Sequence, residues 1–84
     1  MTTWQLTLKD GTVIPITMCG AADGVLWITV PDLGINEAVS IFSLPSKTEK
    51  ITAYGTEKYN NYTELINLTL DHDGQIRIAL RQST

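Results

Sequence analysis

The chain has 84 residues, of which 43% are hydrophobic and 18% charged, and its formal net charge is −3. This length predicts one domain, 1–84, and the apolar share excludes a disordered chain. The six lysine and arginine residues are dispersed, which argues against nucleic-acid binding, and no apolar run approaches the roughly 20 residues of a membrane helix. Twenty-five residues are threonine, isoleucine or valine, which favour strands.

The N-terminal segment predicts a hairpin. Residues 4–8 alternate between apolar and polar side chains, as a half-buried strand does. Asp10-Gly11 follows, a preferred pair for a two-residue type I′ turn. The chain would then return as a strand through residues 12–18, where Pro15 indicates an edge position or a bulge because it has no N–H to donate.

The next segment predicts a loop and a third strand. Residues 19–24 are small and read as a loop, whereas residues 25–30 are apolar on both faces. A strand of that kind is either central in its sheet or meets a partner. Three aromatic residues in register with apolar neighbours are expected in the core: Trp4, Trp27 and Phe42.

A change of hydrophobic period then predicts a helix over residues 35–44. Its apolar stripe consists of Ile35, Ala38, Val39 and Phe42. The helix would begin after Gly34 as N-cap, with Asn36 as the competing cap, and would stop at Pro45.

The last part of the chain predicts three antiparallel strands: residues 50–54, residues 57–70 with a bulge or kink at Asn60-Asn61, and residues 76–81. Asp73-Gly74 turns the chain into the final one. The expected fold class is therefore α+β, mainly β. We expect about six antiparallel strands in the order β-β-β-α-β-β-β, forming a curved sheet or a small open barrel with one short helix.

No set of residues indicates catalysis or cofactor binding. Cys19 is the only cysteine, so no internal disulfide can form, and His72 is the only histidine. A Cys19–His72–Asp arrangement is conceivable on residue types alone, but a loop cysteine and an exposed turn histidine are the expected reading. One cysteine and one histidine also argue against structural zinc.

The Asp71-His72-Asp73-Gly74 segment invites comparison with a calcium-binding EF-hand loop. In that alignment Thr69 and Leu80 occupy the first and last ligand positions, where carboxylates are required. We therefore expect a polar hairpin turn and no metal site here.

Three tyrosines around the turn at residues 55–61 form the candidate interaction patch: Tyr54, Tyr59 and Tyr62. Tyrosine is enriched at interfaces, and aromatic rings can stack on bases or sugars. Packing across neighbouring strands is the competing interpretation, and it is the one the sequence favours.

The chain resembles short, uncharacterised β-rich proteins encoded in phage and prophage gene clusters of Gram-positive bacteria. The matching segments are Leu8-Lys9-Asp10-Gly11-Thr12, Glu37-Ala38 to Ile41-Phe42, Tyr54-Gly55, Tyr62-Thr63-Glu64-Leu65-Ile66 and Asp73-Gly74-Gln75-Ile76 through Leu80-Arg81. The resemblance implies a virion or accessory component, and it supplies no catalytic residue.

These observations predict a non-enzymatic structural or interaction module that acts through a β surface or edge. We expect a protein partner or a homo-oligomer, and neither nucleic acid nor membrane. The alternative is a small barrel that binds an oligosaccharide, nucleotide or peptide through the tyrosine patch. The N-terminus lacks the features of a secretion signal, which favours the bacterial cytoplasm or a virion.

Overall fold

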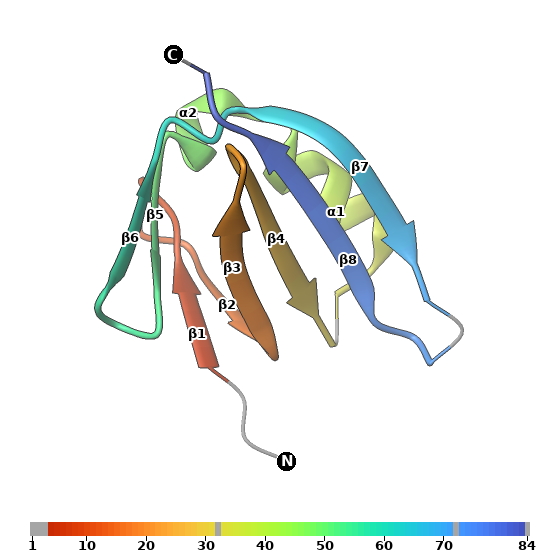
Figure 1. The fold of residues 1–84 in the computed structure, drawn as a ribbon. Coiled ribbons are helices and arrows are strands. Elements are labelled where there is room, and N and C mark those ends of the chain that lie inside the picture. The colour runs from red at the N-terminus through yellow and green to blue at the C-terminus, as the bar shows by residue number, and fades with distance from the viewer. Residues whose placement is uncertain (1–3, 32, 72, 84) are drawn as a thin grey trace.

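The computed structural model describes residues 4–31, 33–71 and 73–83. These residues form two antiparallel four-stranded sheets and two short helices (Figure 1). The first sheet has the strand order β2-β1-β5-β6 and the second sheet the order β3-β4-β8-β7. The elements in chain order are β1 (Trp4–Thr7), β2 (Val13–Ile16), β3 (Met18–Ala22), β4 (Val25–Val30), α1 (Ile35–Phe42), α2 (Pro45–Thr48), β5 (Lys50–Ala53), β6 (Glu57–Asn60), β7 (Glu64–Leu70) and β8 (Ile76–Arg81).

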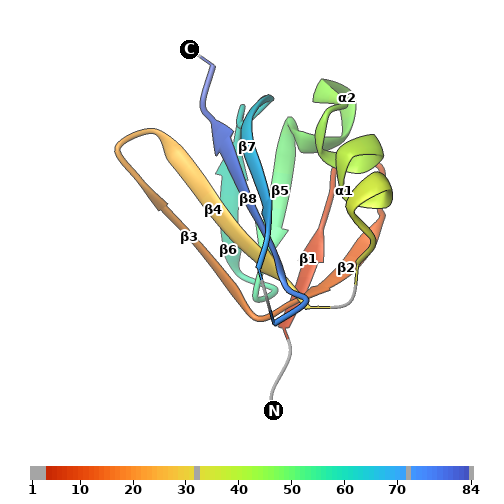
Figure 2. The same cartoon turned by 90° about the vertical axis from the view of Figure 1, so that its right-hand side faces the viewer.

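The predicted fold class, α+β and mainly β, is confirmed, and the short helical turn α2 follows the one helix that the sequence predicts. The two sheets are open and face one another, and they do not close into a barrel (Figure 2). The described strands number eight because two of the predicted segments bend from one sheet into the other. Only Thr17 separates β2 from β3, and residues 61–63 separate β6 from β7.

The loop predicted at residues 19–24 is wrong, because this segment is largely strand β3. It pairs with β4 from Met18 opposite Thr29 to Ala22 opposite Val25. The turn between them is Asp23-Gly24, with φ of 54° and 76°. Positive φ at both positions is the signature of a type I′ hairpin turn. Residues 19–24, whose small side chains suggest a loop, therefore belong to a tight β hairpin.

The type I′ turn expected at Asp10-Gly11 is also wrong. Gly11 has φ of 90°, but Asp10 does not lie in the positive-φ region. The Gly11 N–H donates to Leu8 O, and the Leu8 N–H donates to Thr12 O. This is the wider turn in which a single left-handed glycine follows an ordinary turn.

Helix α1 begins after Gly34, as predicted, and ends at Phe42, two residues earlier than expected. Pro45 follows the first helix and is itself the first residue of a second one, α2. Proline suits that position because its missing N–H is not needed in the first turn. Residues 46–48 therefore lie in a helical turn.

The hydrophobic core lies between the two sheets. Leu6, Ile16 and Ile51 come from the first sheet, and Leu26 and Ile78 come from the second. Helix α1 packs against β7, and α2 packs against β5. The two helices contact each other and lie together on one side of the molecule (Figure 2).

Only some of the residues that the helical stripe and the aromatic pattern predict to lie in the core are buried. Ala38 and Phe42 are fully buried, whereas Ile35 and Val39 are exposed. Trp4 and Trp27 were expected in the core and are also exposed. Trp4 lies at the very end of its strand, and Trp27 points to the opposite face from its buried neighbours on β4.

Candidate functional site

The three candidate tyrosines lie in or directly after strands β5 and β6, at one edge of the first sheet, but they are not exposed as one patch. Tyr62 is only 8% exposed and belongs to the core, which corrects the expected exposure of that side chain. Tyr54 and Tyr59 are half-buried and pack against the core. Their role in binding stays a prediction.

Tyr54 connects the two sheets. Its hydroxyl accepts a hydrogen bond from the Cys19 N–H at 2.7 Å and donates one to the Cys19 carbonyl at 3.0 Å. Tyr54 follows β5 of the first sheet, and Cys19 lies on the edge strand β3 of the second. The hydroxyl therefore occupies backbone groups of an edge strand that could otherwise pair with another chain.

The other two tyrosines pack against each other. The Tyr59 and Tyr62 rings meet edge to face with their centroids 6.0 Å apart, and Tyr54 makes a similar contact with Trp4 at 5.2 Å. Burial raises the pKa of the Tyr59 hydroxyl, with smaller contributions from Cys19, Glu57 and the two other tyrosines. These contacts support packing between strands as the main role of the cluster.

Cys19 does not have the surroundings of a nucleophile. Its thiol is buried, and burial together with the Glu57 carboxylate raises its pKa to about 12. Because the thiolate is the reactive form, the thiol is inert at neutral pH. His72, its conceivable catalytic partner, lies outside the described residues.

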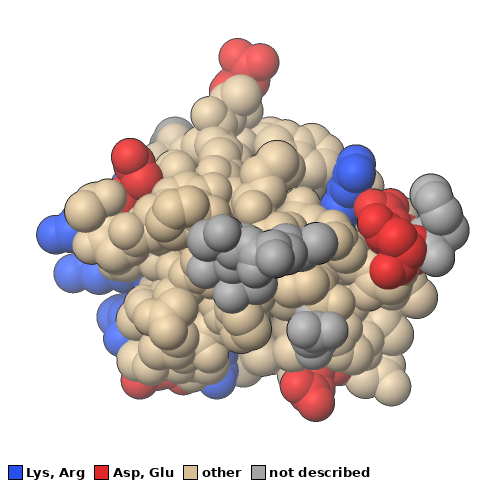
Figure 3. Space-filling model, turned by 90° about the horizontal axis from the view of Figure 1, so that it is seen from below, with Lys and Arg blue, Asp and Glu red and all other residues tan. Residues whose placement is uncertain are grey.

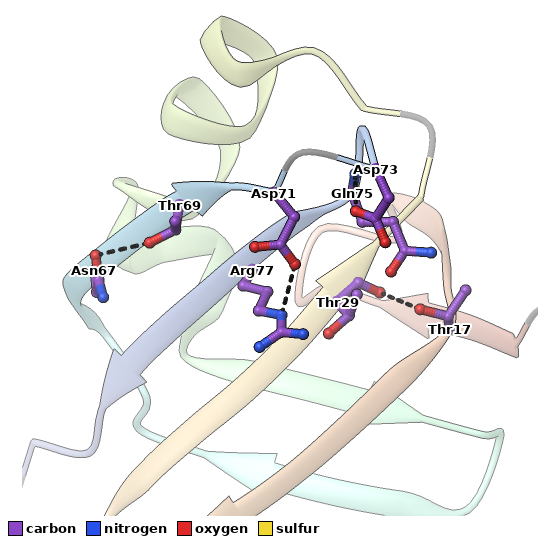
Figure 4. Close-up of polar contacts among 8 residues, drawn as sticks. All are labelled: Thr17, Thr29, Asn67, Thr69, Asp71, Asp73, Gln75 and Arg77. Carbon is purple, nitrogen blue, oxygen red and sulfur yellow. Dashed lines mark hydrogen bonds and ion pairs between the residues drawn. The ribbon is translucent and has the colours of Figure 1, made fainter.

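The carboxylates around the last hairpin make local contacts. Asp71 Oδ2 lies 2.9 Å from Arg77 Nε, and Asp73 Oδ1 accepts a hydrogen bond from the Gln75 N–H at 3.3 Å (Figure 4). Within residues 4–31, 33–71 and 73–83, no group of three His, Cys, Asp or Glu side chains is placed to hold a metal ion, and no pocket is found. Over the same residues, no helix is long and apolar enough to cross a membrane.

The second sheet carries a more distinctive surface, the outer face that points away from the core. Strand register places its side chains in three rows across the sheet. We call this surface the Trp27 face. Its rows are Ala22, Val25, Arg81 and Glu64; Gly20, Trp27, Ala79 and Asn67; and Met18, Thr29, Arg77 and Thr69.

Trp27 lies near the centre of this face and is 44% exposed. In the described part of the chain, no helix lies over it (Figures 1 and 2). Its neighbour Ala79 also points outward yet is fully buried, with Trp27 and Asn67 as its partners on the two adjoining strands. On the other side of Trp27, a Cβ added to Gly20 would meet nothing within 4 Å. In its row across the sheet, Trp27 therefore lies between an alanine and a glycine.

Charged residues lie on only one half of the Trp27 face. Arg77 pairs with Asp71, and Arg81 lies 3.7 Å from Glu64, all on β8 and β7 or the turn after β7. Figure 4 shows Thr69, Arg77 and Thr29 aligned across three neighbouring strands. The outward side chains of β3 and β4 carry no charge.

No dense basic surface is visible at the end of the molecule near residue 4. Acidic and basic side chains are dispersed there, and most of the visible described surface is uncharged (Figure 3). This view agrees with the spread of lysine and arginine along the sequence.

Trp27 was missed as a surface residue, although the sequence held a signal for it. Leu26, Ile28 and Val30 alternate on the buried side of β4. Because successive side chains on a strand point to opposite faces, Trp27 must lie on the other side from these three. Hydrophobicity alone gave the wrong placement.

Comparison of the chain with protein-family models, curated proteins and solved structures finds no match.

Proposed function

We propose that this protein is a non-enzymatic interaction module that docks a protein partner on the Trp27 face. The observation that carries the proposal is a tryptophan, 44% exposed, near the centre of a sheet face that no described helix covers. A strand that is apolar on both faces is expected either to lie inside its sheet or to meet a partner. Strand β4 lies inside its sheet, and its outer face is left free for a partner.

The residue types on this face support a protein partner. Tryptophan and arginine are the residues most enriched among interface hot spots, and methionine is enriched at interfaces generally. The Arg77 and Arg81 side chains are 62% and 58% exposed, and Met18 is also exposed. An apolar centre beside a charged margin is the usual organisation of a docking surface.

The tyrosine cluster offers less support for the alternative ligand-binding function. The Tyr54 hydroxyl already bonds to two backbone groups, and Tyr62 is buried. A ligand would have to displace these internal contacts before it could use the rings.

We place the module in the bacterial cytoplasm or in a phage virion, as a phage-derived structural or accessory component. This setting rests on the resemblance of the hairpin, helix and C-terminal segments to short phage and prophage proteins. Genes for tail or capsid proteins beside the coding sequence would support this setting, and a chromosomal neighbourhood without phage genes would count against it.

Site-specific photo-crosslinking in the native cells tests the docking surface. A p-benzoylphenylalanine residue replaces Met18 on the Trp27 face or, as the control, the exposed Lys58 on the outer side of the first sheet. We expect adducts from position 18 that disappear when Trp27→Thr is added, and none from position 58. Equal adducts from both positions, or none from position 18, would overturn the proposal.

A further inference from the structure

Three Asp-Gly pairs occur in the chain, at residues 10–11, 23–24 and 73–74. This dipeptide is chemically labile, because glycine has no side chain to shield its backbone nitrogen, which can attack the carboxyl carbon of the preceding aspartate. The attack needs a free carboxyl group, a free glycine N–H and a turn that opens easily. The fold meets these three conditions to different extents at the three pairs.

At the first pair, contacts hold both reacting groups. The Asp10 carboxylate accepts a hydrogen bond from the Thr12 N–H at 3.0 Å and pairs with Lys47 at 3.0 Å. The Gly11 N–H donates to Leu8 O at 3.0 Å. The lowered pKa of the Asp10 carboxyl also keeps it ionised, and an ionised carboxylate is a poor target because it has no hydroxyl group to leave as water.

The third pair is held in the same way. Asp73 Oδ1 accepts a hydrogen bond from the Gln75 N–H at 3.3 Å, and the Gly74 N–H donates to Asp71 O at 3.0 Å. A further hydrogen bond, from the Asp71 N–H to Gln75 O at 2.8 Å, closes the turn. Ring closure at this pair must therefore break contacts at both reacting groups.

The second pair lacks these restraints. Asp23 is exposed, and within the described residues no hydrogen bond engages its carboxylate or the Gly24 N–H. The turn joins β4 to the edge strand β3 and projects from the rest of the molecule (Figure 2). From outside this hairpin, the Gln82 N–H donates to Gly24 O at 2.8 Å. A hairpin end held by few contacts opens locally at low cost.

The backbone of Asp23 adds a further difference. Its φ is 54°, whereas Asp10 and Asp73 do not have positive φ. An L-residue adopts this left-handed conformation at an energetic cost, so opening of the turn relieves strain at Asp23 and not at the other two aspartates. The geometry and the hydrogen bonds thus select the same pair.

We propose that Asp23-Gly24 is a site of spontaneous modification, at which the folded protein forms isoaspartate ahead of its two other Asp-Gly pairs. The inference concerns the chemical ageing of the chain and is independent of the docking function. Water is the one co-reactant, and nothing is oxidised or reduced.

The reaction has two steps. The Gly24 nitrogen forms a bond to Asp23 Cγ, the Cγ–OH bond breaks, and the hydroxyl leaves as water with the amide proton, which gives a succinimide ring. A water molecule then opens the ring. Opening at Cγ restores aspartate, whereas opening at the Asp23 main-chain carbonyl breaks the original peptide bond. The chain then continues through the side chain, with one more backbone carbon, a free α-carboxylate and an unchanged mass.

Peptide mapping of the folded protein after prolonged incubation at neutral pH tests the site. Fragmentation by electron transfer locates isoaspartate, and protein L-isoaspartyl methyltransferase quantifies it by methylating the free α-carboxylate. We expect isoaspartate to form at residue 23 at least tenfold faster than at residue 10 or 73, because two ordinary hydrogen bonds are enough for that factor. A rate at residue 23 no higher than at either other pair would overturn the inference.

The same measurement on the chain unfolded in urea separates the fold from the local sequence. There the three pairs should react at rates within about threefold of one another, because they share the same dipeptide. A lead of residue 23 that persists undiminished in urea would overturn the inference, since its neighbours in sequence would then cause it.

Asp23→Glu is the matched variant. It keeps the charge at the turn, but glutamate would have to close a six-membered ring, which forms less readily. Methylation of the folded variant should fall to the level that the two other pairs supply. Methylation as strong as in the wild type would place the modification elsewhere and contradict the assignment to Asp23.

Discussion

Tyr54 has a backbone conformation that residues with side chains rarely adopt, with φ of 58°. Such a conformation costs on the order of 1–3 kcal/mol and persists only where other contacts hold it. Here the contacts are the two hydrogen bonds to Cys19 and the edge-to-face packing on Trp4. A single side chain thus joins the β5–β6 turn to an edge strand of the opposite sheet.

Replacing Tyr54 with phenylalanine should therefore destabilise the fold. The Tyr54→Phe variant keeps the ring but leaves the Cys19 N–H and carbonyl without these partners, which should lower the free energy of unfolding by about 1–3 kcal/mol. Urea unfolding followed by circular dichroism measures the change. Tyr59→Phe is the control, because no hydrogen bond from the Tyr59 hydroxyl is found within the described residues, and it should cost less. Equal losses in both variants would mean that the hydrogen bonds from Tyr54 to Cys19 do not stabilise the fold.

Asp10 gives the fold a dependence on acid pH. Hydrogen bonds from the Thr12 hydroxyl and backbone N–H, with a further contribution from Lys47, lower the pKa of the Asp10 carboxyl from 3.8 to about 2. The folded state thus favours the ionised form. The stability that this preference contributes is present above pH 4 and is lost as the pH falls from about 4 to about 2.

We expect the Asp10→Asn variant to lose less stability than the wild type between pH 4 and pH 2. Urea midpoints at several pH values measure this difference. In a parallel NMR titration, Thr12→Val should move the Asp10 carboxyl pKa upward, because it removes the hydroxyl hydrogen bond. An unchanged titration in Thr12→Val would show that the hydroxyl does not hold the pKa down.

At the scale of elements, helix α1 has an N-terminus that could be improved. Gly34 is the N-cap and forms no side-chain hydrogen bond to the first turn. Its φ of −69° suits any residue, and a Cβ there would meet nothing within 4 Å. Glu37 already occupies the third helical position, so serine at position 34 would complete a capping box.

The Gly34→Ser variant should therefore be more stable than the wild type by about 0.5–1 kcal/mol, from the cap and from the reduced freedom of the unfolded chain. For a domain of this size, that corresponds to a rise in Tm of about 2–8 °C. The matched control is Gly24→Ser, where φ of 76° makes any side chain unfavourable and Tm should fall. A fall in Tm for Gly34→Ser would contradict the observed cap.

Most of the strands and helix α1 could be predicted from local pattern, whereas β3 and α2 could not. Alternation identified β8, and the three-four spacing identified α1 to within two residues at its end. Turn geometry was harder, because an Asp-Gly pair fits more than one turn: Asp23-Gly24 has two positive φ values, whereas at Asp10-Gly11 only the glycine does. The difference depends on strand register, which a local pattern does not contain.

The candidate site could be predicted less well, for a physical reason at the same scale. The tyrosines were identified as a cluster from their spacing, but their burial depends on the opposite sheet, which supplies Cys19 to Tyr54. Trp27 was misplaced because its hydrophobicity was weighed above its alternation with Leu26 and Ile28. That Gly20 is its neighbour across the sheet follows only when β3 is paired with β4.

At the scale of the whole molecule, the two sheets share one core. Leu6 and Ile51 of the first sheet lie in the same buried cluster as Leu26 and Ile78 of the second. Neither sheet could keep its inner face out of water without the other, because each sheet is open. The two sheets should therefore unfold together, in one cooperative step.

The two tryptophans allow this cooperativity to be measured, because Trp4 lies on the first sheet and Trp27 on the second. In Trp27→Phe the fluorescence reports only on the first sheet, and in Trp4→Phe only on the second. We expect the fluorescence midpoint in urea to coincide with the circular-dichroism midpoint within each variant. The comparison is made within each variant because each substitution changes the overall stability. Separate midpoints in either variant would mean that one sheet persists after the other has unfolded, which the shared core does not allow.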